Sequence, residues 1–355
     1  MNANRTPIVS IIVPTYNCKE YAKVCIEHIL NQTYPYWELF LVNGASTDGT
    51  TELCDNFANQ DNRITSIHDI DGLVQARNVG FEHATGDWIM YIDGDDWIDM
   101  DTLEKLIDST QRYENLEVVF FNYVQDFNGE KIQKWKWECK EKEYLYKDGD
   151  CMTLSNHTLF YKSGISEAYN KIVRTDFARK HLLYHNKKLR QGVEGTEYTL
   201  RVFRNATRVL YVNEDFYHYR YNINSLGHKI DEKDAKYISE GFLEIYRYIE
   251  NLPIEYQNNF KKALYERSLY ALIAKAMSTY FNPSNKENYS IRCKKFTHFI
   301  NESFVIREAL RKAQFNSFDS SRRIVLLAIK YKVYIIVQCI AIAKQILLQK
   351  GKFDY

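Results

Sequence analysis

Short apolar segments alternate with amphipathic ones along the first 115 residues, and this alternation is the feature that most constrains the fold. Residues 8–13, 37–42, 64–67 and 88–92 are apolar, of strand length, and rich in β-branched or aromatic side chains. The segments between them place apolar residues at helical spacing, as in 18–31. Such alternation is typical of a parallel sheet with crossover helices. The sequence therefore predicts an α/β fold whose strand-end loops meet in one ligand-binding crevice.

The later part of the chain has a different pattern. Residues 116–124 predict another sheet strand, 128–150 predict exposed hairpins or a loop, and the pattern is helical from 234 onward. A chain of 355 residues has room for a large domain and a smaller one. The expected domains are 1–228, with halves of about 1–115 and 116–228, and a helical C-terminal region, 229–355.

Three carboxylates follow the fourth apolar run with no turn between. Asp93, Asp95 and Asp96 would repel one another at the end of a buried strand, and the arrangement costs least when a hard divalent cation is shared between them. An alternative is helix capping, with Asp99 or Asp101 at the start of a helix. Capping needs one carboxylate, so it leaves the first three unexplained.

Composition excludes some classes of protein and favours others. The net charge of +1 gives no electrostatic case for a nucleic-acid partner. The seven cysteines are scattered and form no CxxC pair, which argues for reduced thiols in the cytoplasm and against a disulfide framework or a structural zinc site. No signal peptide is evident. The 28 tyrosines would suit a protein that handles sugars.

Four motifs in this order resemble the family 2 glycosyltransferases, which have a GT-A fold. They are Val-Ser-Ile-Ile-Val-Pro-Thr-Tyr-Asn at 9–17, Ser-Thr-Asp-Gly at 46–49, Ala-Arg-Asn-Val-Gly at 76–80 and Asp-Gly-Asp-Asp-Trp at 93–97. The resemblance continues more loosely to about residue 230 and is similar there to bacterial capsule and cell-wall polysaccharide enzymes. It implies a mixed, Rossmann-like sheet that binds a nucleotide-diphosphate sugar.

The resemblance also implies a donor site. Asp93 and Asp95 would hold Mn²⁺ or Mg²⁺ on the diphosphate, with Gly94 leaving the backbone unobstructed. Asp96 and Trp97 would face the sugar and the acceptor, although Trp97 could equally be core packing. The remaining implied donor contacts are Pro14, Tyr16 and Asn17 at the base and ribose, and Arg77 near the uridine or its phosphates.

The loop after the second strand departs from the family pattern. Two adjacent acids are usual there, one of which reads the base, and this chain has Asn43 and Gly44. The amide of Asn43 could still hydrogen-bond a base edge, since it offers both a donor and an acceptor. Asp48 either contacts the donor or serves only as a turn residue before a helix.

A second departure concerns the catalytic base. Inverting members usually carry a Glu-Asp pair, and the match here reads Glu194-Gly195. An inverting displacement needs a carboxylate that takes the proton of the acceptor hydroxyl. Glu194 is the nearest substitute and Glu197 lies one helical turn on, but acids in a first helical turn also favour the helix dipole, so neither need be the base.

Residues near 220 give weaker signals. His218 and His228 could reach the metal or diphosphate, as histidines do in related folds, or be ordinary packed or exposed histidines. Arg220 and Ser225 fit a pattern of the family and could touch the diphosphate.

The C-terminal segment is apolar and basic. Its longest uncharged run, 333–343, is too short to cross a bilayer. We expect an amphipathic basic helix over about 322–350 that lies on an anionic membrane surface, or else packs against the domain or a second subunit.

These patterns together predict a metal-dependent, inverting glycosyltransferase of surface polysaccharide synthesis, cytoplasmic and peripheral at the inner face of the membrane. Its partners would be a nucleotide sugar, expected to be UDP-linked, and a glycan or lipid-linked acceptor. Formation of a homo-oligomer stays open. A catalytically degenerate protein that binds nucleotide sugars or glycans would instead explain the missing acids. A structural assembly partner that docks through its C-terminal helices is a third reading.

Overall fold

The computed structural model describes residues 6–127, 130–135, 137–161, 163–190, 192–220 and 232–349. The chain divides into two compact units. The first comprises residues 1–158, 162–190 and 194–222, and the second comprises 159–161, 191–193 and 223–355. The predicted boundary at 228/229 lies outside the described residues.

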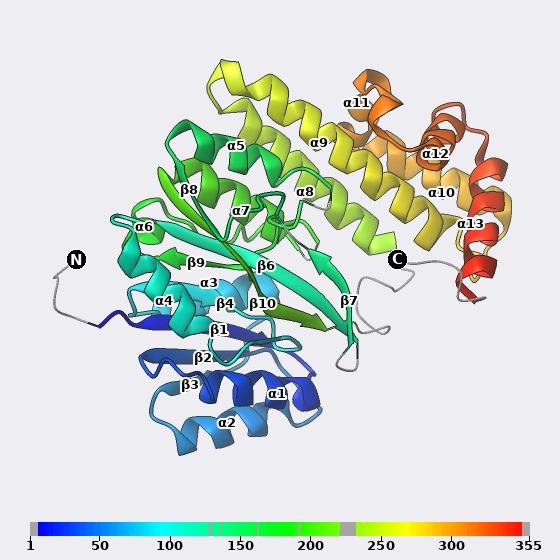
Figure 1. The fold of residues 1–355 in the computed structure, drawn as a ribbon. Coiled ribbons are helices and arrows are strands. Elements are labelled where there is room, and N and C mark those ends of the chain that lie inside the picture. Colours follow the sequence, from blue (N-terminus) through cyan, green and yellow to red (C-terminus); the bar gives the residue numbers. More distant parts are fainter. Residues whose placement is uncertain are drawn as a thin grey trace. The chain divides into compact units, whose positions relative to one another are not determined.

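The first unit is built on a mixed sheet (Figure 1), which confirms the predicted fold class. Among the described residues its strand order is β3-β2-β1-β4-β9-β6-β10-β5, with β7 beside β6 and β8 beside β10. The four N-terminal strands are parallel, and β9 runs antiparallel to both β4 and β6. The strands are β1 (Val9–Thr15), β2 (Trp37–Asn43), β3 (Ile64–Ile67), β4 (Trp88–Tyr91), β5 (Trp97–Ile98), β6 (Val118–Phe127), β7 (Glu130–Trp135), β8 (Glu143–Lys147), β9 (Lys171–Arg174) and β10 (Arg208–Arg220).

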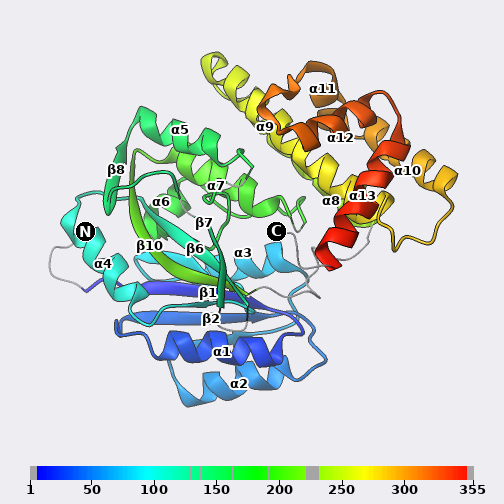
Figure 2. The same cartoon turned by 45° about the vertical axis from the view of Figure 1, so that its right-hand side comes forward.

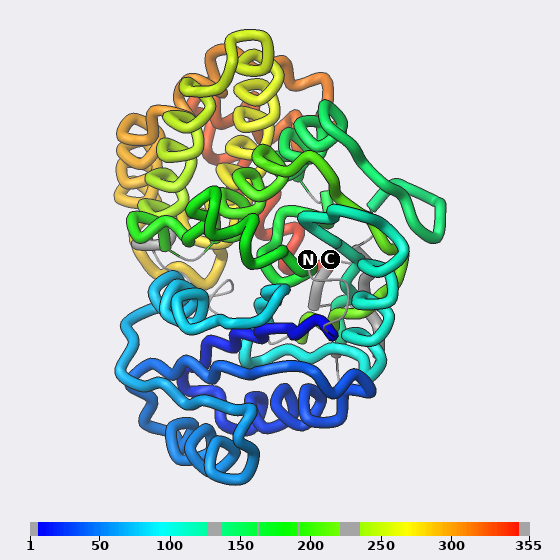
Figure 3. Tube along the Cα trace, turned by 90° about the vertical axis from the view of Figure 1, so that its left-hand side faces the viewer, coloured from blue at the N-terminus to red at the C-terminus, as the bar shows by residue number. Residues whose placement is uncertain are grey.

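Helices cover both faces of this sheet. Alternate residues of β1 point to opposite sides, so Ile11 packs in a core with Ile26 of α1, whereas Ile12 packs in a second core with Phe81 of α3. Figure 3 shows α1 and α2 together on one side of β1 and β2 and α3 on the other. The helices of this unit are α1 (Lys19–Leu30), α2 (Thr50–Gln60), α3 (Leu73–His83), α4 (Thr102–Arg112), α5 (Gly149–His157), α6 (Thr175–Lys180) and α7 (Glu194–Asn205).

The segment predicted as exposed hairpins or a loop is more ordered than expected. One hairpin is present, because β7 pairs antiparallel with β6. However, β8 pairs with β10 and extends the sheet, and α5 follows it directly. The loop prediction is therefore wrong for 143–150, where Leu145 and Tyr146 pack against the cores of the sheet.

The second unit is helical, as its sequence predicts (Figure 2). Phe242, Ile245 and Ile249 of α8 are buried along one face, at the expected helical spacing. The elements are α8 (Glu232–Glu250), α9 (Ile254–Lys275), a π-helical turn (Ala276–Tyr280), α10 (Tyr289–Glu302), α11 (Phe304–Lys312), a 3₁₀ turn (Phe315–Ser317), α12 (Ser320–Lys330) and α13 (Tyr334–Gln349).

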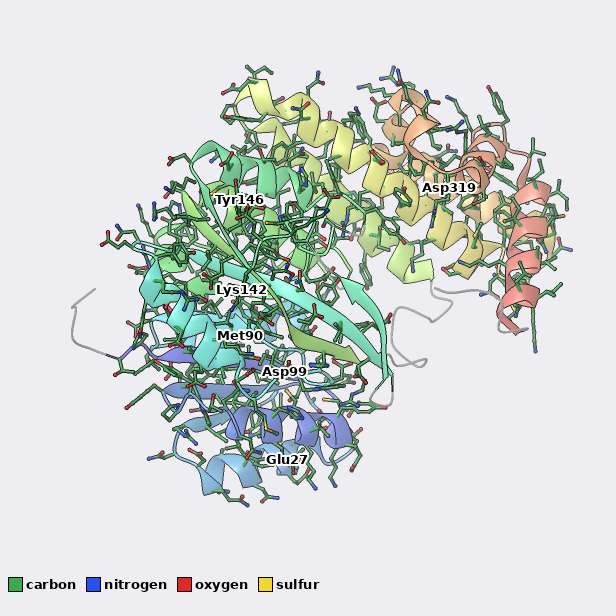
Figure 4. The ribbon with its side chains drawn as sticks, viewed as in Figure 1. Glu27, Met90, Asp99, Lys142, Tyr146 and Asp319 are labelled. Atoms are coloured by element: carbon green, nitrogen blue, oxygen red, sulfur yellow. The ribbon has the colours of Figure 1, made fainter. Side chains whose placement is uncertain are left out.

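The predicted single helix over 322–350 is wrong, because two helices occupy this segment. Asp319, labelled in Figure 4, caps α12 by accepting hydrogen bonds from the backbone N–H groups of Ser321 and Arg322. The chain leaves α12 through Lys332, whose φ of 59° is left-handed, and α13 begins two residues later. No glycine or proline stands between the two helices, and the apolar pattern continues across the turn, so the sequence gives no sign that the helix ends there.

The outward face of α13 is apolar. Tyr334, Val337 and Ala341 are buried. The exposed side chains on the other side include Ile335, Ile336, Ile342 and Ile346, which are 39–53% exposed. Among the described residues, no helix combines the length and hydropathy that a bilayer span requires.

Candidate active site

The loops after β1 and β2 form one hydrogen-bonded structure. Thr15 Oγ1 donates to Asn43 Oδ1 at 3.2 Å, where the two strands end side by side. Farther along, the Asn17 backbone N–H donates to Ser46 Oγ at 3.0 Å, and the Thr47 N–H donates to Asn17 Oδ1 at 2.8 Å. Asn17 sits at a φ of 47°, a conformation that asparagine tolerates better than most residues. The two loops therefore present a single rigid edge.

Asn43 stabilises this edge through three side-chain hydrogen bonds. Its Oδ1 accepts hydrogen bonds from Thr15 and from Ser46, the latter at 2.8 Å, and its Nδ2 donates to Thr51 Oγ1 at 2.7 Å. Only 1% of the residue is exposed. The structure thus does not meet the expectation that Asn43 reads a base edge, because its amide is used within the loops.

Gly44 lies against the ring of Tyr16. A Cβ at position 44 would be 2.9 Å from Tyr16 Cδ2, and the Gly44 N–H donates to the Thr15 carbonyl oxygen at 2.9 Å. Tyr16 itself is 65% exposed. A side chain at position 44 would therefore require this exposed ring to move.

Asp48 links the same two loops. Its Oδ2 accepts from the Lys19 N–H at 3.1 Å, and its Oδ1 accepts from the N–H and Oγ1 of Thr50 at 3.0 and 2.6 Å. Burial raises the pKa of this carboxyl, but the hydrogen bonds from Thr50 and Lys19 outweigh burial and hold the pKa below its ordinary value. Of the two roles predicted for Asp48, donor contact or turn residue, the structure shows the turn role.

The acidic motif starts where β4 ends and lies directly beside β1. The Asp96 N–H donates to the Asp93 carbonyl oxygen at 3.0 Å, which closes a tight turn. A Cβ on Gly94 would be 2.7 Å from the carbonyl oxygen of Pro14 and 3.0 Å from Thr15 Cγ2. Only glycine fits this contact, and it brings the motif against the end of β1. Met90 on β4 and Asp99 after β5, both labelled in Figure 4, bracket the turn.

Arg77 of α3 joins Asp93 to the start of α7. Its Nη2 donates to Asp93 Oδ1 at 2.6 Å, and its Nη1 lies 3.6 Å from Glu194 Oε1. Burial lowers the pKa of Arg77, but the charges of Asp93 and Glu194 raise it by more. Its Nε and Nη1 have no hydrogen-bond partner within the described part of the chain, although the side chain is only 3% exposed. A buried guanidinium with spare donors suits an anionic ligand.

Asp93 and Asp95 fit a divalent cation that is shared with a ligand. Burial, followed by the charge of Asp93, raises the pKa of Asp95 to about 6. A cation between the two carboxylates would relieve this repulsion. The described residues contain no cluster of three or more His, Cys, Asp or Glu side chains around a metal position. Two carboxylates suffice where a diphosphate supplies further oxygens, as is usual for Mg²⁺.

Asp96 points into the protein and not toward the crevice, contrary to the expectation that it faces the sugar. It is fully buried, and its Oδ2 accepts a hydrogen bond from the Tyr217 hydroxyl at 2.6 Å while its Oδ1 accepts from the Arg220 N–H at 2.8 Å. Burial raises the pKa of Asp96 well above its ordinary value. The Tyr217 oxygen also accepts from the Asp93 N–H at 3.2 Å, so this pair fastens β10 to the motif.

Trp97 and Arg220 form one side of the motif. The Trp97 ring stacks on His218 with centroids 5.1 Å apart, and Arg220 Cζ lies 4.4 Å from the Trp97 ring centroid. Arg220 Nε also donates to the Asp95 carbonyl oxygen at 2.8 Å. His218 is buried, with Nε2 2.9 Å from Asp99 Oδ1, so the structure shows it as a packed histidine. His228 and Ser225 lie outside the described residues.

The two glutamates predicted at the start of α7 both contact arginines. Glu194 is 7% exposed and lies beside Arg77, and burial raises its pKa by more than Arg77 lowers it. Glu197 is 5% exposed, and its two oxygens accept from Arg201 Nε and Nη2 at 2.7 and 2.9 Å.

One carboxylate at this place was not predicted. A Cβ built on Gly195 would lie 3.7 Å from Glu167 Oε2 and 3.4 Å from the Ala168 nitrogen. Glu167 stands immediately before the 168–174 segment that resembles the family, but no sequence spacing pairs it with position 195. The one hint in the sequence was the glycine at 195, which leaves the usual aspartate to be replaced by a residue from elsewhere.

Comparison with protein families gives one match over this unit. Residues 10–181 match the model of Glycosyl transferase family 2. A curated relative, EpsH of Bacillus subtilis (strain 168), is named provisionally as a glycosyltransferase. It is 28% identical over 340 residues, which span 92% of this chain and 93% of EpsH.

Solved structures share the fold. TarS 1–349 of Staphylococcus aureus in complex with UDP-GlcNAc superposes with a TM-score of 0.65 and 18% identity over 98% of this chain and 93% of that one. The mannosyltransferase PcManGT of Pyrobaculum calidifontis, in complex with GDP-Man and Mn²⁺, superposes with a TM-score of 0.51 and 16% identity. The match covers 99% of this chain and 89% of that one. These likenesses show that the fold is of the GT-A type.

Proposed function

Since residues 10–181 form a family 2 glycosyltransferase domain on the GT-A fold, we propose that this enzyme transfers a sugar from a nucleotide-diphosphate donor to a hydroxyl group of a glycan or lipid-linked acceptor. The observation that carries the proposal is the position of Asp93 and Asp95. They stand at the carboxyl end of β4, beside the buried guanidinium of Arg77. The carboxyl ends of parallel strands are where sheets of this kind bind ligands.

The proposed donor site uses charge to hold a diphosphate. Arg77 would donate from Nε, which has no hydrogen-bond partner within the described residues, while its Nη1 faces Glu194. Asp93 and Asp95 would hold Mn²⁺ or Mg²⁺, which would neutralise the negative charge that grows on the leaving diphosphate. The Mn²⁺ in the PcManGT complex supports this choice of ion.

The nucleotide would lie along the edge made by the first two loops. Tyr16 is exposed there and would offer a ring face to a base, with Pro14 and Asn17 on either side of it in the loop. A UDP-linked sugar is the donor that we favour, which the UDP-GlcNAc complex of TarS supports.

The acceptor half of the reaction requires a base. In an inverting transfer the acceptor oxygen bonds to the anomeric carbon as the bond to the diphosphate breaks, and a carboxylate takes the hydroxyl proton. We place this reaction in the synthesis of a surface polysaccharide. TarS, which is named as a poly(ribitol-phosphate) β-N-acetylglucosaminyltransferase, supports that setting.

A binding panel tests the donor. Thermal unfolding would be recorded with UDP-GlcNAc, UDP-glucose, UDP-galactose and GDP-mannose, each with and without Mn²⁺. We expect one UDP sugar to raise the unfolding temperature, and Mn²⁺ to enlarge that rise. A panel in which no nucleotide sugar changes the unfolding temperature would reject the proposed function.

Substitution of the acidic motif tests the chemistry. Asp93→Asn with Asp95→Asn should abolish both the Mn²⁺-dependent stabilisation and the release of UDP from the selected donor. Asp71→Asn, at an exposed position on another loop, is the matched control and should change neither. A wild-type protein that binds the donor tightly but never turns it over, even with Mn²⁺ and a range of glycan acceptors, would instead support the degenerate, sugar-binding reading.

A membrane surface is the proposed location. The outward face of α12 and α13 presents Ile324, Leu327, Ile335 and Ile342 to solvent. Both helices lack acidic residues. They carry four basic ones, Arg322, Arg323, Lys330 and Lys344, and Lys332 in the turn between them adds a fifth. Exposed apolar side chains among basic ones complement an anionic leaflet, such as the inner face of the cell membrane, where each basic residue contributes on the order of 1 kcal/mol.

A further inference from the structure

The place of the absent aspartate is occupied by another carboxylate. Gly195 follows Glu194 at the start of α7, where the family pattern has its second acid. The Cβ of a residue at 195 would make ordinary contacts with its neighbours, and Glu167 Oε2 is one of them, at 3.7 Å. A carboxylate from residue 167 therefore reaches the volume that an aspartate at 195 would fill.

The other two acids nearby are already engaged. Glu197 accepts two hydrogen bonds from Arg201, and Glu194 lies against Arg77. A carboxylate whose oxygens face an arginine is less available to an acceptor hydroxyl than one without such a partner. Glu167 differs, because its Oε1 accepts from Ser166 Oγ at 3.1 Å and its Oε2 meets no arginine or lysine within the described chain.

Glu167 also lies near the acidic motif. Its carboxylate stands beside Gly195, and the preceding residue, Glu194, has Oε1 3.6 Å from Arg77 Nη1. Arg77 in turn donates from Nη2 to Asp93 Oδ1 at 2.6 Å. The side chain of Glu167 is partly exposed, unlike those of Glu194 and Glu197. It is thus open to a ligand while standing close to the proposed donor site.

The backbone around Glu167 is held firmly. Its carbonyl oxygen accepts from Thr199 Oγ1 of α7 at 3.0 Å and from Lys171 Nζ of β9. These contacts join residue 167 to the same helix that carries Gly195. The fold therefore holds the backbone of residue 167 next to α7.

We propose that Glu167 is the catalytic base, acting from the position that residue 195 holds elsewhere in the family. This inference rests on the proposed glycosyl transfer. The Glu167 carboxylate accepts the proton of the acceptor hydroxyl while that oxygen bonds to the anomeric carbon. The bond from the anomeric carbon to the diphosphate breaks, and its electron pair leaves on the nucleoside diphosphate. The protonated glutamate then returns its proton to solvent.

The assignment is tested by removing the carboxylate at residue 167 and then placing one at residue 195. The activity measured is UDP release from the sugar nucleotide selected by the binding panel, with Mn²⁺ and water as the acceptor. Glu167→Gln should lower the rate by about 10²–10⁴-fold. Donor affinity should stay within about twofold, because the base contacts the acceptor and not the diphosphate.

The double variant Glu167→Gln with Gly195→Asp should recover at least about tenfold of the lost rate. Glu167→Gln with Gly195→Asn has the same shape without the carboxylate and should recover none. Glu82→Gln, at an exposed position on α3, is the surface control and should keep the wild-type rate. Unfolding temperatures of all variants show whether each is folded.

Two results would overturn the assignment: a folded Glu167→Gln protein with the wild-type rate, or a double variant that binds the donor and is no faster than its asparagine counterpart. Failure of the proposed function has a different signature, since it is seen in the wild-type protein as the absence of donor binding.

Discussion

The hydroxyl of Tyr217 donates a 2.6 Å hydrogen bond to Oδ2 of Asp96, and both residues are fully buried. The same phenolic oxygen accepts the Asp93 N–H, so a single atom fixes both ends of the acidic turn to β10. This makes the geometry of the motif depend on a residue more than 120 positions away in the chain.

Tyr217→Phe should therefore destabilise the protein by about 1–3 kcal/mol, the usual result of leaving a buried polar group without its partner. The loss would be measured by urea unfolding. Tyr36→Phe, at a 51% exposed position, is the control and should change the free energy of unfolding by less than about 0.5 kcal/mol. Equal stability of the Tyr217→Phe and wild-type proteins would contradict the anchoring role.

Arg77→Lys should weaken donor binding by at least about tenfold, because lysine keeps the charge but loses the planar set of donors that reaches Asp93 and Glu194 together. Titration with UDP and Mn²⁺ measures the affinity. Arg112→Lys, which alters a surface pair with Glu143, is the matched control. Unchanged UDP affinity in a folded Arg77→Lys protein would remove Arg77 from the donor site.

Lys171 should make stability rise with pH. Burial lowers the pKa of this lysine from 10.5 to about 7, which the charge of Glu167 opposes and that of Arg77 reinforces. Between these two values the unfolded chain binds more protons here than the folded one, so the free energy of unfolding increases as pH rises through the window. Below about pH 7 Lys171 is protonated in both the folded and the unfolded protein, and the buried charge then lowers the free energy of unfolding by its full amount.

Lys171→Met should flatten this dependence. Between about pH 7.5 and 9.5 the wild-type protein should gain up to about 2 kcal/mol relative to the variant, since one pKa unit is worth about 1.4 kcal/mol. Urea unfolding at the two pH values gives the comparison. Parallel pH curves for the two proteins would show that Lys171 is charged in the folded state.

The outward face of α13 should mediate membrane binding. Ile335→Ser, Ile342→Ser and Ile346→Ser combined should lower binding to liposomes that contain anionic lipid by at least about fivefold, and deletion of 321–355 should abolish it. Ile254→Ser with Ile291→Ser changes exposed isoleucines of other helices and is the control. Full binding by the triple variant would reject this surface as the site of contact.

Local patterns in the sequence predicted the strands, the crossover helices and the loops that carry the motifs. Strand residues such as Ile11 and Ile12 are apolar on both faces, and this double burial is visible from composition alone. The helical second unit was equally evident from spacing. The turn at Lys332 was not, because a left-handed lysine leaves no mark in an apolar pattern.

The direction of individual polar side chains could not be predicted either. Asn43 and Asp96 both lie in donor-loop motifs, yet hydrogen bonds from Thr15 and Tyr217 turn them inward. Each of those partners comes from a different strand, so only the assembled sheet reveals the choice. The roles proposed for Tyr16, Asn17, Trp97 and Arg220 stay predictions.

The proximity of Gly195 to Glu167 has a consequence for how such chains are sorted. A survey that judges activity by one alignment column would find glycine at 195 and class this chain as a dead homologue. A survey of structures that asks which carboxylate lies at the position of the usual aspartate would find Glu167 and keep this chain among the candidate enzymes. Similar chains that lack the usual residue are therefore worth inspecting for a carboxylate supplied from another segment, as Glu167 is here from the segment before β9, before they are set aside as inactive.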